Sequence, residues 1–161
     1  NIGGFDSHAN QMKDQPLLMA RVAQSVSWFF SALDGLGMGA NATLFTASDF
    51  GRTFTSNGDG TDHGWGAHHL VMGGAVQGGR IFGQMPQLGR MNTNDPMFDS
   101  SPDQLRNGVL LPTTSVDQLA YTLGRWMGVS AYDLTQGGNY AILPNLTRFN
   151  SSAHDLGFMR A

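Results

Sequence analysis

The sequence predicts an α/β fold from three observations. A helical repeat of apolar residues runs from Pro16 to Leu36, a short apolar and β-rich segment follows at 42–48, and a second helical repeat lies at 115–127. The residues directly after Asn1 look like the end of a strand. Strand, helix and strand in that order are typical of a parallel α/β sheet. We therefore expect a mostly parallel sheet flanked by helices.

The first helix is predicted to begin at Pro16, because proline is favoured at the first helical position, where its missing N–H would be unpaired anyway. Gly35 and Gly37 supply the stop. The residues that recur at helical spacing are Met19, Val22, Val26, Phe29, Leu33 and Leu36. The next segment, 42–48, is bounded by turn residues and is predicted to be a buried strand.

Segment 49–66 is polar and rich in glycine, and we expect it to be a long loop leaving the C-terminal end of that strand. Two short strands are predicted at 69–72 and 80–82. The region 84–108 is rich in Pro, Asn, Asp and Ser, which favours a surface excursion.

The second helix is predicted to begin near Thr114 or Ser115 and to end before Gly128. Its expected apolar face consists of Val116, Leu119, Ala120, Leu123, Trp126 and Met127. One further helical turn is predicted at 130–134, and 142–149 is expected to be a loop or short strand.

Composition narrows the class of protein. With 161 residues, 40% hydrophobic and 13% charged, the chain suits a packed domain rather than a disordered tail. Its 9 Lys and Arg against 12 Asp and Glu argue against a nucleic-acid surface, and no apolar run is long enough to span a membrane. The absence of Cys excludes disulfides and thiolate ligands from this chain.

Asp6 and His8 are the first candidate site residues. Two positions apart, they would share one face of an extended segment, and a carboxylate with an imidazole suits Zn or Mn. The alternative is that Asp6 caps the turn into the helix while His8 is an ordinary surface residue.

Asp49 directly follows the predicted strand, and Arg52 comes three residues later. Ligands of open α/β sheets bind outside the carboxyl ends of strands, so Asp49 could hold a metal there. Arg52 could offer its planar fork to a phosphate or sulfate oxygen. Equally, the two residues could form a structural pair that closes a turn.

A third group comprises Asp62, His63, His68 and His69. The glycines beside His63 would let the backbone approach a ligand closely. His68 and His69 are consecutive, so on a strand they face opposite ways, and we expect one to pack and the other to be solvated.

Four motifs in order make the chain resemble a known family: GFDSHANQ, TLFTASDFGRT, GTDHGWGAHHLVMGGAVQGGRIFG and LLPTTSVDQLAYTLGRWMGVS. They are similar to the C-terminal third of a large bacterial family of secreted, sulfatase-like proteins in the alkaline phosphatase superfamily. Its members are mostly catalogued as a domain of unknown function and often carry a twin-arginine export signal.

This resemblance implies that Asp6, His8 and His63 bind one divalent metal (Zn, Mn, Ca or Mg) and that Asp49 belongs to a second site. Phe50 departs from the superfamily, which usually has His there, so Arg52 could act instead as a substrate clamp. The superfamily's nucleophile lies in an N-terminal half, which implies that 1–161 is the C-terminal portion of a larger alkaline-phosphatase-like domain. That portion alone is expected to be inactive.

The implied function is hydrolysis of a phosphate or sulfate ester in the periplasm or outside the cell. Its partners would be an anionic ester substrate and the N-terminal half of its own chain. The alternative is a non-catalytic binding or scaffold protein with degenerate metal sites. Hydrolysis requires Asp6, His8 and His63 to converge with Asp49 nearby, whereas a scaffold would leave them dispersed or hydrogen-bonded to backbone.

Overall fold

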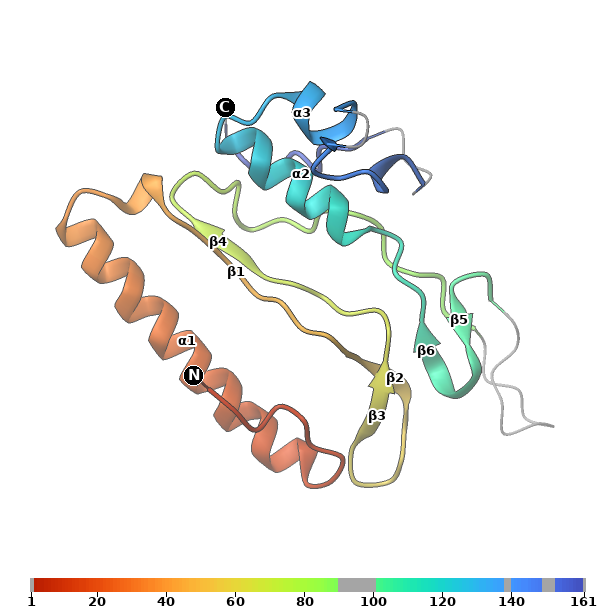
Figure 1. Ribbon diagram of the computed structural model, residues 1–161. Coiled ribbons are helices and arrows are strands. Elements are labelled where there is room, and N and C mark those ends of the chain that lie inside the picture. The colour runs from red at the N-terminus through yellow and green to blue at the C-terminus, as the bar shows by residue number, and fades with distance from the viewer. Residues whose placement is uncertain (1, 90–100, 138–139, 149–152, 161) are drawn as a thin grey trace. The chain divides into compact units, whose positions relative to one another are not determined.

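The computed structural model describes residues 2–89, 101–137, 140–148 and 153–160. The chain divides into two compact units: Asn1–Gly74 with Pro86–Pro112, and Ala75–Met85 with Thr113–Ala161. Helices and small sheets occur together, which confirms a mixed α/β protein (Figure 1). Each sheet in the described residues has two antiparallel strands, so the mostly parallel sheet stays a prediction.

In the first unit, helix α1 spans Gln11–Gly35 and so begins before Pro16, which lies inside it. Asn10 precedes the helix in the left-handed region (φ 54°), which asparagine tolerates better than most residues. The inward stripe is narrow: Leu18 is buried, while Val22 and Val26 are half-buried.

Met19 and Phe29 were expected on the inward stripe of α1 but are 42% and 38% exposed. The prediction was off by one position at these two places, where Leu18 and Phe30 turn inward instead. Although α1 has 25 residues, no helix in the described part of the chain is both long and apolar enough to cross a membrane.

Strands β1 (Thr43–Phe45) and β4 (Val71–Gly73) pair antiparallel, with Leu44 opposite Met72. A short 3-10 helix, η1 (Gly39–Asn41), precedes β1. The strand predicted at 42–48 is therefore present but shorter. Because β1 pairs with β4 alone in a two-stranded sheet, the strand is half-buried rather than buried. Phe45, for example, is 46% exposed.

The segment expected to be a long loop, 49–66, contains a β-hairpin instead. Strands β2 (Gly51–Ser56) and β3 (Thr61–Gly64) pair antiparallel, with Arg52 opposite His63. The turn forms because the Asn57 side-chain oxygen accepts hydrogen bonds from the N–H groups of Asp59 and Gly60. On both sides of this turn lie threonines, whose β-branched side chains favour strands. The many glycines of the segment favour a loop instead, which is why the sequence does not predict the hairpin.

Strands β5 (Gln104–Leu105) and β6 (Val109–Leu110) flank the 3-10 helix η2 (Arg106–Gly108). The N–H of Gly66 donates to the carbonyl of Leu110 at 2.8 Å, which joins β6 to the end of the hairpin. The surface excursion predicted for 84–108 thus includes one strand, and its stretch 90–100 lies outside the described residues.

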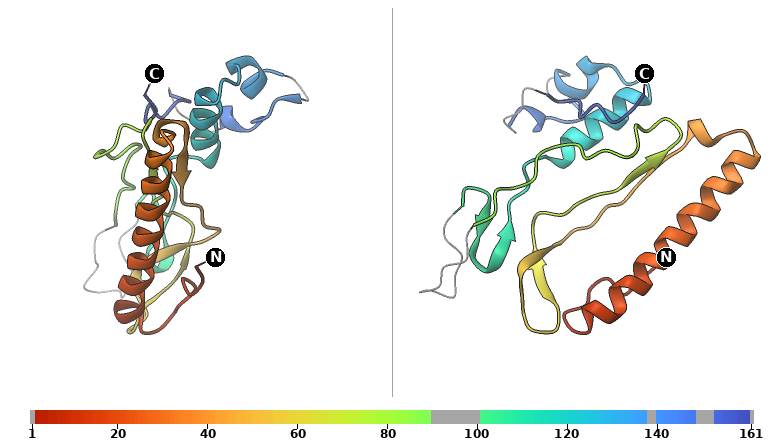
Figure 2. Two further views of the ribbon diagram at one scale, coloured as in Figure 1. Left: turned by 90° about the vertical axis from the view of Figure 1, so that its left-hand side faces the viewer. Right: turned by 180° about the vertical axis from the view of Figure 1, so that it is seen from behind.

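Figure 2 shows from behind how the turn of the β2–β3 hairpin meets the N-terminal end of α1. There the N–H of Gln11 donates to the carbonyl of Asp59 at 3.2 Å. The Thr61 hydroxyl also donates to the Gln11 side-chain oxygen at 2.8 Å. The hairpin therefore anchors the start of α1, and with it the segment that carries Asp6 and His8.

The second unit contains α2 (Val116–Trp126), α3 (Ala131–Thr135) and the 3-10 helix η4 (Leu146–Arg148). Ser115 forms a capping box with Gln118, which confirms the predicted start of the helix. The expected apolar face is partly wrong, since Val116 and Met127 are each 75% exposed.

The buried residues of α2 are the polar residues Gln118 and Thr122. Their side chains form hydrogen bonds with neighbouring backbone groups. Gln118 donates to the carbonyl of Ala153, and Thr122 accepts from the N–H of Leu156. Among the described residues of this unit, the buried apolar side chains are those of Val76, Leu134, Leu146 and Phe158.

Three further segments of the second unit have a predicted structure. The turn predicted at 130–134 is confirmed as α3. Residues 80–82 are not a strand, and within 142–149 the regular element is η4 rather than a strand; Phe149 itself lies outside the described residues.

Candidate metal centre

Asp6 and His8 lie on an extended segment that precedes α1 and runs against the turn of the hairpin. The Asn57 amide donates to the carbonyl of His8 at 3.0 Å. A Cβ on Gly60 would lie 2.7 Å from that same carbonyl oxygen, so only glycine permits this approach. The close packing of segment and turn brings Asp6 and His8 to the hairpin strand that carries His63.

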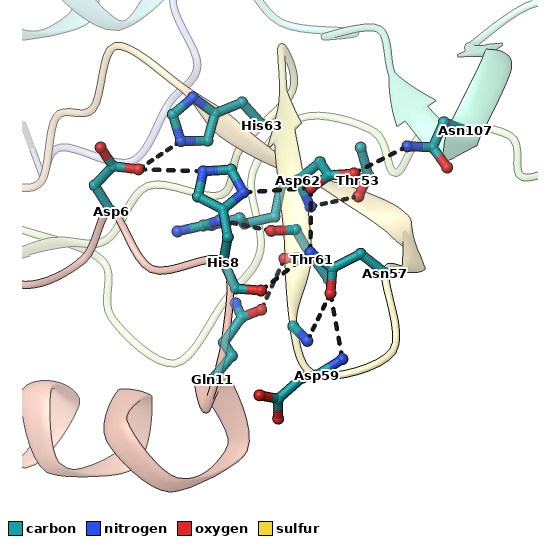
Figure 3. Close-up of polar contacts among 12 residues, drawn as sticks. Asp6, His8, Gln11, Thr53, Asn57, Asp59, Thr61, Asp62, His63 and Asn107 are labelled. Carbon is teal, nitrogen blue, oxygen red and sulfur yellow. Dashed lines mark hydrogen bonds and ion pairs between the residues drawn. The ribbon is translucent and has the colours of Figure 1, made fainter.

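Asp6, His8 and His63 offer ligand atoms that all lie within 4.8 Å of one another. The Nε2 atom of His63 is 2.7 Å from Asp6 Oδ1, and the Nε2 atom of His8 is 3.5 Å from that same oxygen. Figure 3 shows both imidazoles turned toward the Asp6 carboxylate. The structure thus brings together three of the four residues predicted to bind metal.

These three side chains face solvent, with Asp6 67%, His8 49% and His63 43% exposed. The hydrogen bond from His63 is the main reason that the pKa of Asp6 lies below its ordinary value, and the charges of His63, His8 and Arg52 act in the same direction. Asp6 is therefore held as a carboxylate, the form in which it can bind a cation.

Asp49, the fourth predicted ligand, is exposed and lies outside this group of three. It lines a shallow hollow of about 400 Å³ together with Phe50, His63 and Trp65. The Phe50 ring stacks on the His63 imidazole, with centroids 4.0 Å apart and planes within 9°. His63 therefore belongs both to the candidate metal centre and to the hollow that contains Asp49.

Arg52 lies beside the site and is hydrogen-bonded to backbone. Its guanidinium donates to the carbonyl of Thr61 at 2.8 Å and to the carbonyl of Phe5 at 2.5 Å. It also lies 5.2 Å from the centre of the Phe50 ring. Among the ion pairs of the described residues none joins Asp49 to Arg52, so the turn-closing pair considered as an alternative does not form.

The other histidines lie outside the group. His68 and His69 are both exposed, so the expectation that one of them packs is wrong. His69 Nδ1 is 3.5 Å from the Thr46 hydroxyl, across the strand pair β1–β4. In the second unit, His154 makes an edge-on contact with the Tyr121 ring.

The sequence placed Asp62 in a candidate group but did not indicate that it contacts His8. Asp62 Oδ1 is 3.3 Å from His8 Nδ1, and it also accepts a hydrogen bond from the Asn57 amide at 3.1 Å. That hydrogen bond from Asn57, followed by the one from His8, lowers the pKa of Asp62 below its ordinary value. Asp62 is next to His63 in the sequence, but its partner His8 is 54 residues away, so the spacing of residues does not predict their contact.

No curated protein and no solved structure matches the chain. One family model does, and its description is "Protein of unknown function (DUF1501)". The match extends over residues 1–136 and therefore includes the whole candidate metal centre and the hollow beside it. On that extent of similarity, the chain belongs to the DUF1501 family.

Proposed function

We propose that Asp6, His8 and His63 bind a divalent metal that serves the hydrolysis of a phosphate or sulfate ester. The observation that carries this proposal is the convergence of one carboxylate and two imidazole nitrogens from positions far apart in the chain. Their side-chain contacts run to one another and, for His8, to the Asp62 carboxylate, unlike the backbone hydrogen bonds expected of a scaffold. The resemblance to sulfatase-like proteins of the alkaline phosphatase superfamily, with its mostly parallel sheet, supplies the reaction class.

The two separations to Asp6 Oδ1 are close to those between ligand atoms around a metal. Ligand atoms about 2.1 Å from a tetrahedral Zn²⁺ lie about 3.4 Å from each other. The separation between His8 Nε2 and Asp6 Oδ1 is 3.5 Å, close to that value. The shorter contact between His63 and Asp6 is a hydrogen bond, which would open by less than about 1 Å once a metal took the place of the proton.

The donor set favours Zn or Mn over Ca or Mg, because the last two prefer sites made of oxygen ligands. Three protein ligands also leave at least one coordination position free, as in catalytic zinc sites. When bound, such a metal supplies Lewis-acid stabilisation of the charge that develops on an ester oxygen. The exposure of all three side chains leaves that free position accessible to substrate and water.

Asp49 and Arg52 complete the proposed site. Asp49 would hold a second cation on the other side of His63, in the hollow where Phe50 replaces the histidine usual in the superfamily. Arg52 has five N–H donors, and the hydrogen bonds to Thr61 and Phe5 leave others to neutralise charge on the transferred group. Arg52 is thus proposed both to contact substrate and to hold the site together.

The rest of the domain would supply the nucleophile and would cover α1. Trp28 and Leu36 are 73% and 72% exposed on this helix. Large apolar side chains at such exposure suit a helix that packs against further parts of an α/β domain. By the same resemblance, the protein would be exported to the periplasm or secreted.

A non-catalytic binding or scaffold protein is the second candidate, and Phe50 favours it. Its ring stacks on His63 at the position where the superfamily usually places another ligand. A single metal centre without a second cation would bind an anion but would neutralise less of the charge in an ester's transition state.

Elemental analysis of the full-length protein, followed by assays with aryl phosphate and aryl sulfate, tests the proposal. We expect close to one or two equivalents of Zn or Mn and turnover of one ester class. His63→Ala should lose the metal and the activity, whereas His68→Ala, an exposed histidine outside the group, should keep both. A metal-free protein would refute the metal centre. A metal-loaded protein inactive on both esters would favour the scaffold.

A further inference from the structure

His8 has two ring nitrogens, and the structure gives each a carboxylate partner. Nε2 faces Asp6 Oδ1 at 3.5 Å, and Nδ1 faces Asp62 Oδ1 at 3.3 Å. Figure 3 shows the His8 ring between these two carboxylates. We infer that Asp62 is a positioning residue, which holds the proton of His8 on Nδ1 and leaves Nε2 free to bind the metal. This inference rests on the proposed metal centre.

The physical argument concerns one proton. A neutral imidazole carries its proton on one nitrogen, and an ionised carboxylate can only accept a hydrogen bond. Asp6 and Asp62 therefore compete for the same proton. If Asp6 held it, Nε2 would be protonated and would have to lose that proton before it could bind a metal. The Asp62 contact, which is the shorter of the two, favours the tautomer that presents a lone pair to the site.

Asp62 is itself held in place. Its N–H donates to the hydroxyl of Thr53 at 3.1 Å, and Thr53 is only 4% exposed. The Asn57 amide donates both to Asp62 Oδ1 and to the carbonyl of His8, so one side chain links the two partners. The Asn107 amide donates to the other oxygen, Asp62 Oδ2, at 3.5 Å. A carboxylate with these contacts can fix the orientation of an otherwise half-exposed imidazole.

His63 is fixed differently, which makes the role of Asp62 specific to His8. The His63 ring contacts two other rings: Phe50 stacks on it with centroids 4.0 Å apart, and the His8 ring is tilted relative to it at 4.8 Å. Removal of Asp62 should therefore disturb the tautomer of His8 without changing how His63 is held.

The first measurement uses Zn²⁺ as the probe and compares its affinity for the full-length wild type, Asp62→Ala, Asp62→Asn and Asp34→Ala. We expect a loss of about 10- to 100-fold for Asp62→Ala, typical of removing an outer partner of a metal-binding histidine. Asp62→Asn should lose less, because its amide oxygen still accepts from Nδ1–H. Asp34→Ala removes the same charge from an exposed position near the C-terminal end of α1, at the far end of the helix from the segment that carries His8, and should bind as the wild type does.

The second measurement needs no metal, and its first step needs no variant that could misfold. Nitrogen-15 NMR of the metal-free wild type, recorded at about pH 9, should show His8 protonated on Nδ1. Asp62→Ala should shift that proton toward Nε2. A wild type with the proton on Nε2, or Asp62→Ala with unchanged Zn²⁺ affinity, would overturn the role of Asp62. A wild type that binds no Zn²⁺ would instead overturn the proposed function.

Discussion

Asp6 Oδ1 and His63 Nε2 lie 2.7 Å apart although 57 residues separate them in the chain. The contact depends on the β2–β3 hairpin, which carries His63 and whose turn receives the segment containing Asp6 and His8. A site assembled from two distant segments stays intact only while the hairpin and the segment remain packed together.

Metal selectivity follows from the donor set. Because two of the three ligand atoms are imidazole nitrogens, Zn²⁺ or Mn²⁺ should raise the thermal midpoint of the chelator-treated protein more than Ca²⁺ or Mg²⁺ at equal concentration. A ligand present at about 100 times its Kd adds about 2.7 kcal/mol of stability. Scanning calorimetry would measure the shift. A larger shift with Ca²⁺ would contradict the assignment of His8 and His63 as ligands.

Arg52→Met should destabilise the protein, because it removes the hydrogen bonds to the carbonyls of Thr61 and Phe5. We expect the free energy of unfolding in urea to fall by about 2 kcal/mol. The affinity for Zn²⁺ should fall too, since Phe5 adjoins Asp6. Arg21→Met, on the exposed side of α1, is the matched control and should change neither quantity. If the unfolding free energy of Arg52→Met were unchanged, Arg52 would not hold the site together, and only its proposed contact with substrate would remain.

The sequence allowed prediction of the elements that have strong local signals. The capping box at Ser115 and the helical repeat after Pro16 are properties of neighbouring residues, and both helices were found. For the hairpin the sequence predicts a loop, because glycine is typical of loops. In the structure Gly51, Gly60 and Gly64 permit close contacts, as Gly60 does with the carbonyl of His8.

The candidate site shows the same division. The residue types Asp6, His8 and His63 pointed to a metal, and the structure brings them together. What sequence could not supply was the second carboxylate on His8, because the contact with Asp62 depends on how the segment crosses the hairpin. Nor could the sequence show that Arg52 donates to two backbone carbonyls, since every residue has a carbonyl and residue type does not indicate which one accepts.

Gly60→Ala tests the approach of the segment to the hairpin. Its Cβ would lie 2.7 Å from the carbonyl oxygen of His8, so segment and turn must separate. Overpacking of this kind costs about 1–3 kcal/mol, which urea unfolding would measure, and the Zn²⁺ affinity should fall with it. Gly3→Ala is the control, because a Cβ there meets nothing within 4 Å. Equal Zn²⁺ affinities for the two variants would show that this contact does not hold Asp6 and His8 in place.

The lowered pKa of Asp6 predicts how the metal-free protein responds to acid. A carboxyl whose pKa is lower in the folded than in the unfolded state adds stability above its unfolded pKa, about 3.9, and loses that contribution as the pH falls through the folded pKa. Asp6→Asn cannot titrate. The excess stability of the wild type over Asp6→Asn should therefore be larger near pH 6 than near pH 3, as measured by urea unfolding at both values. A difference that stayed constant or grew toward acid would mean that the hydrogen bond between His63 and Asp6 does not favour the carboxylate.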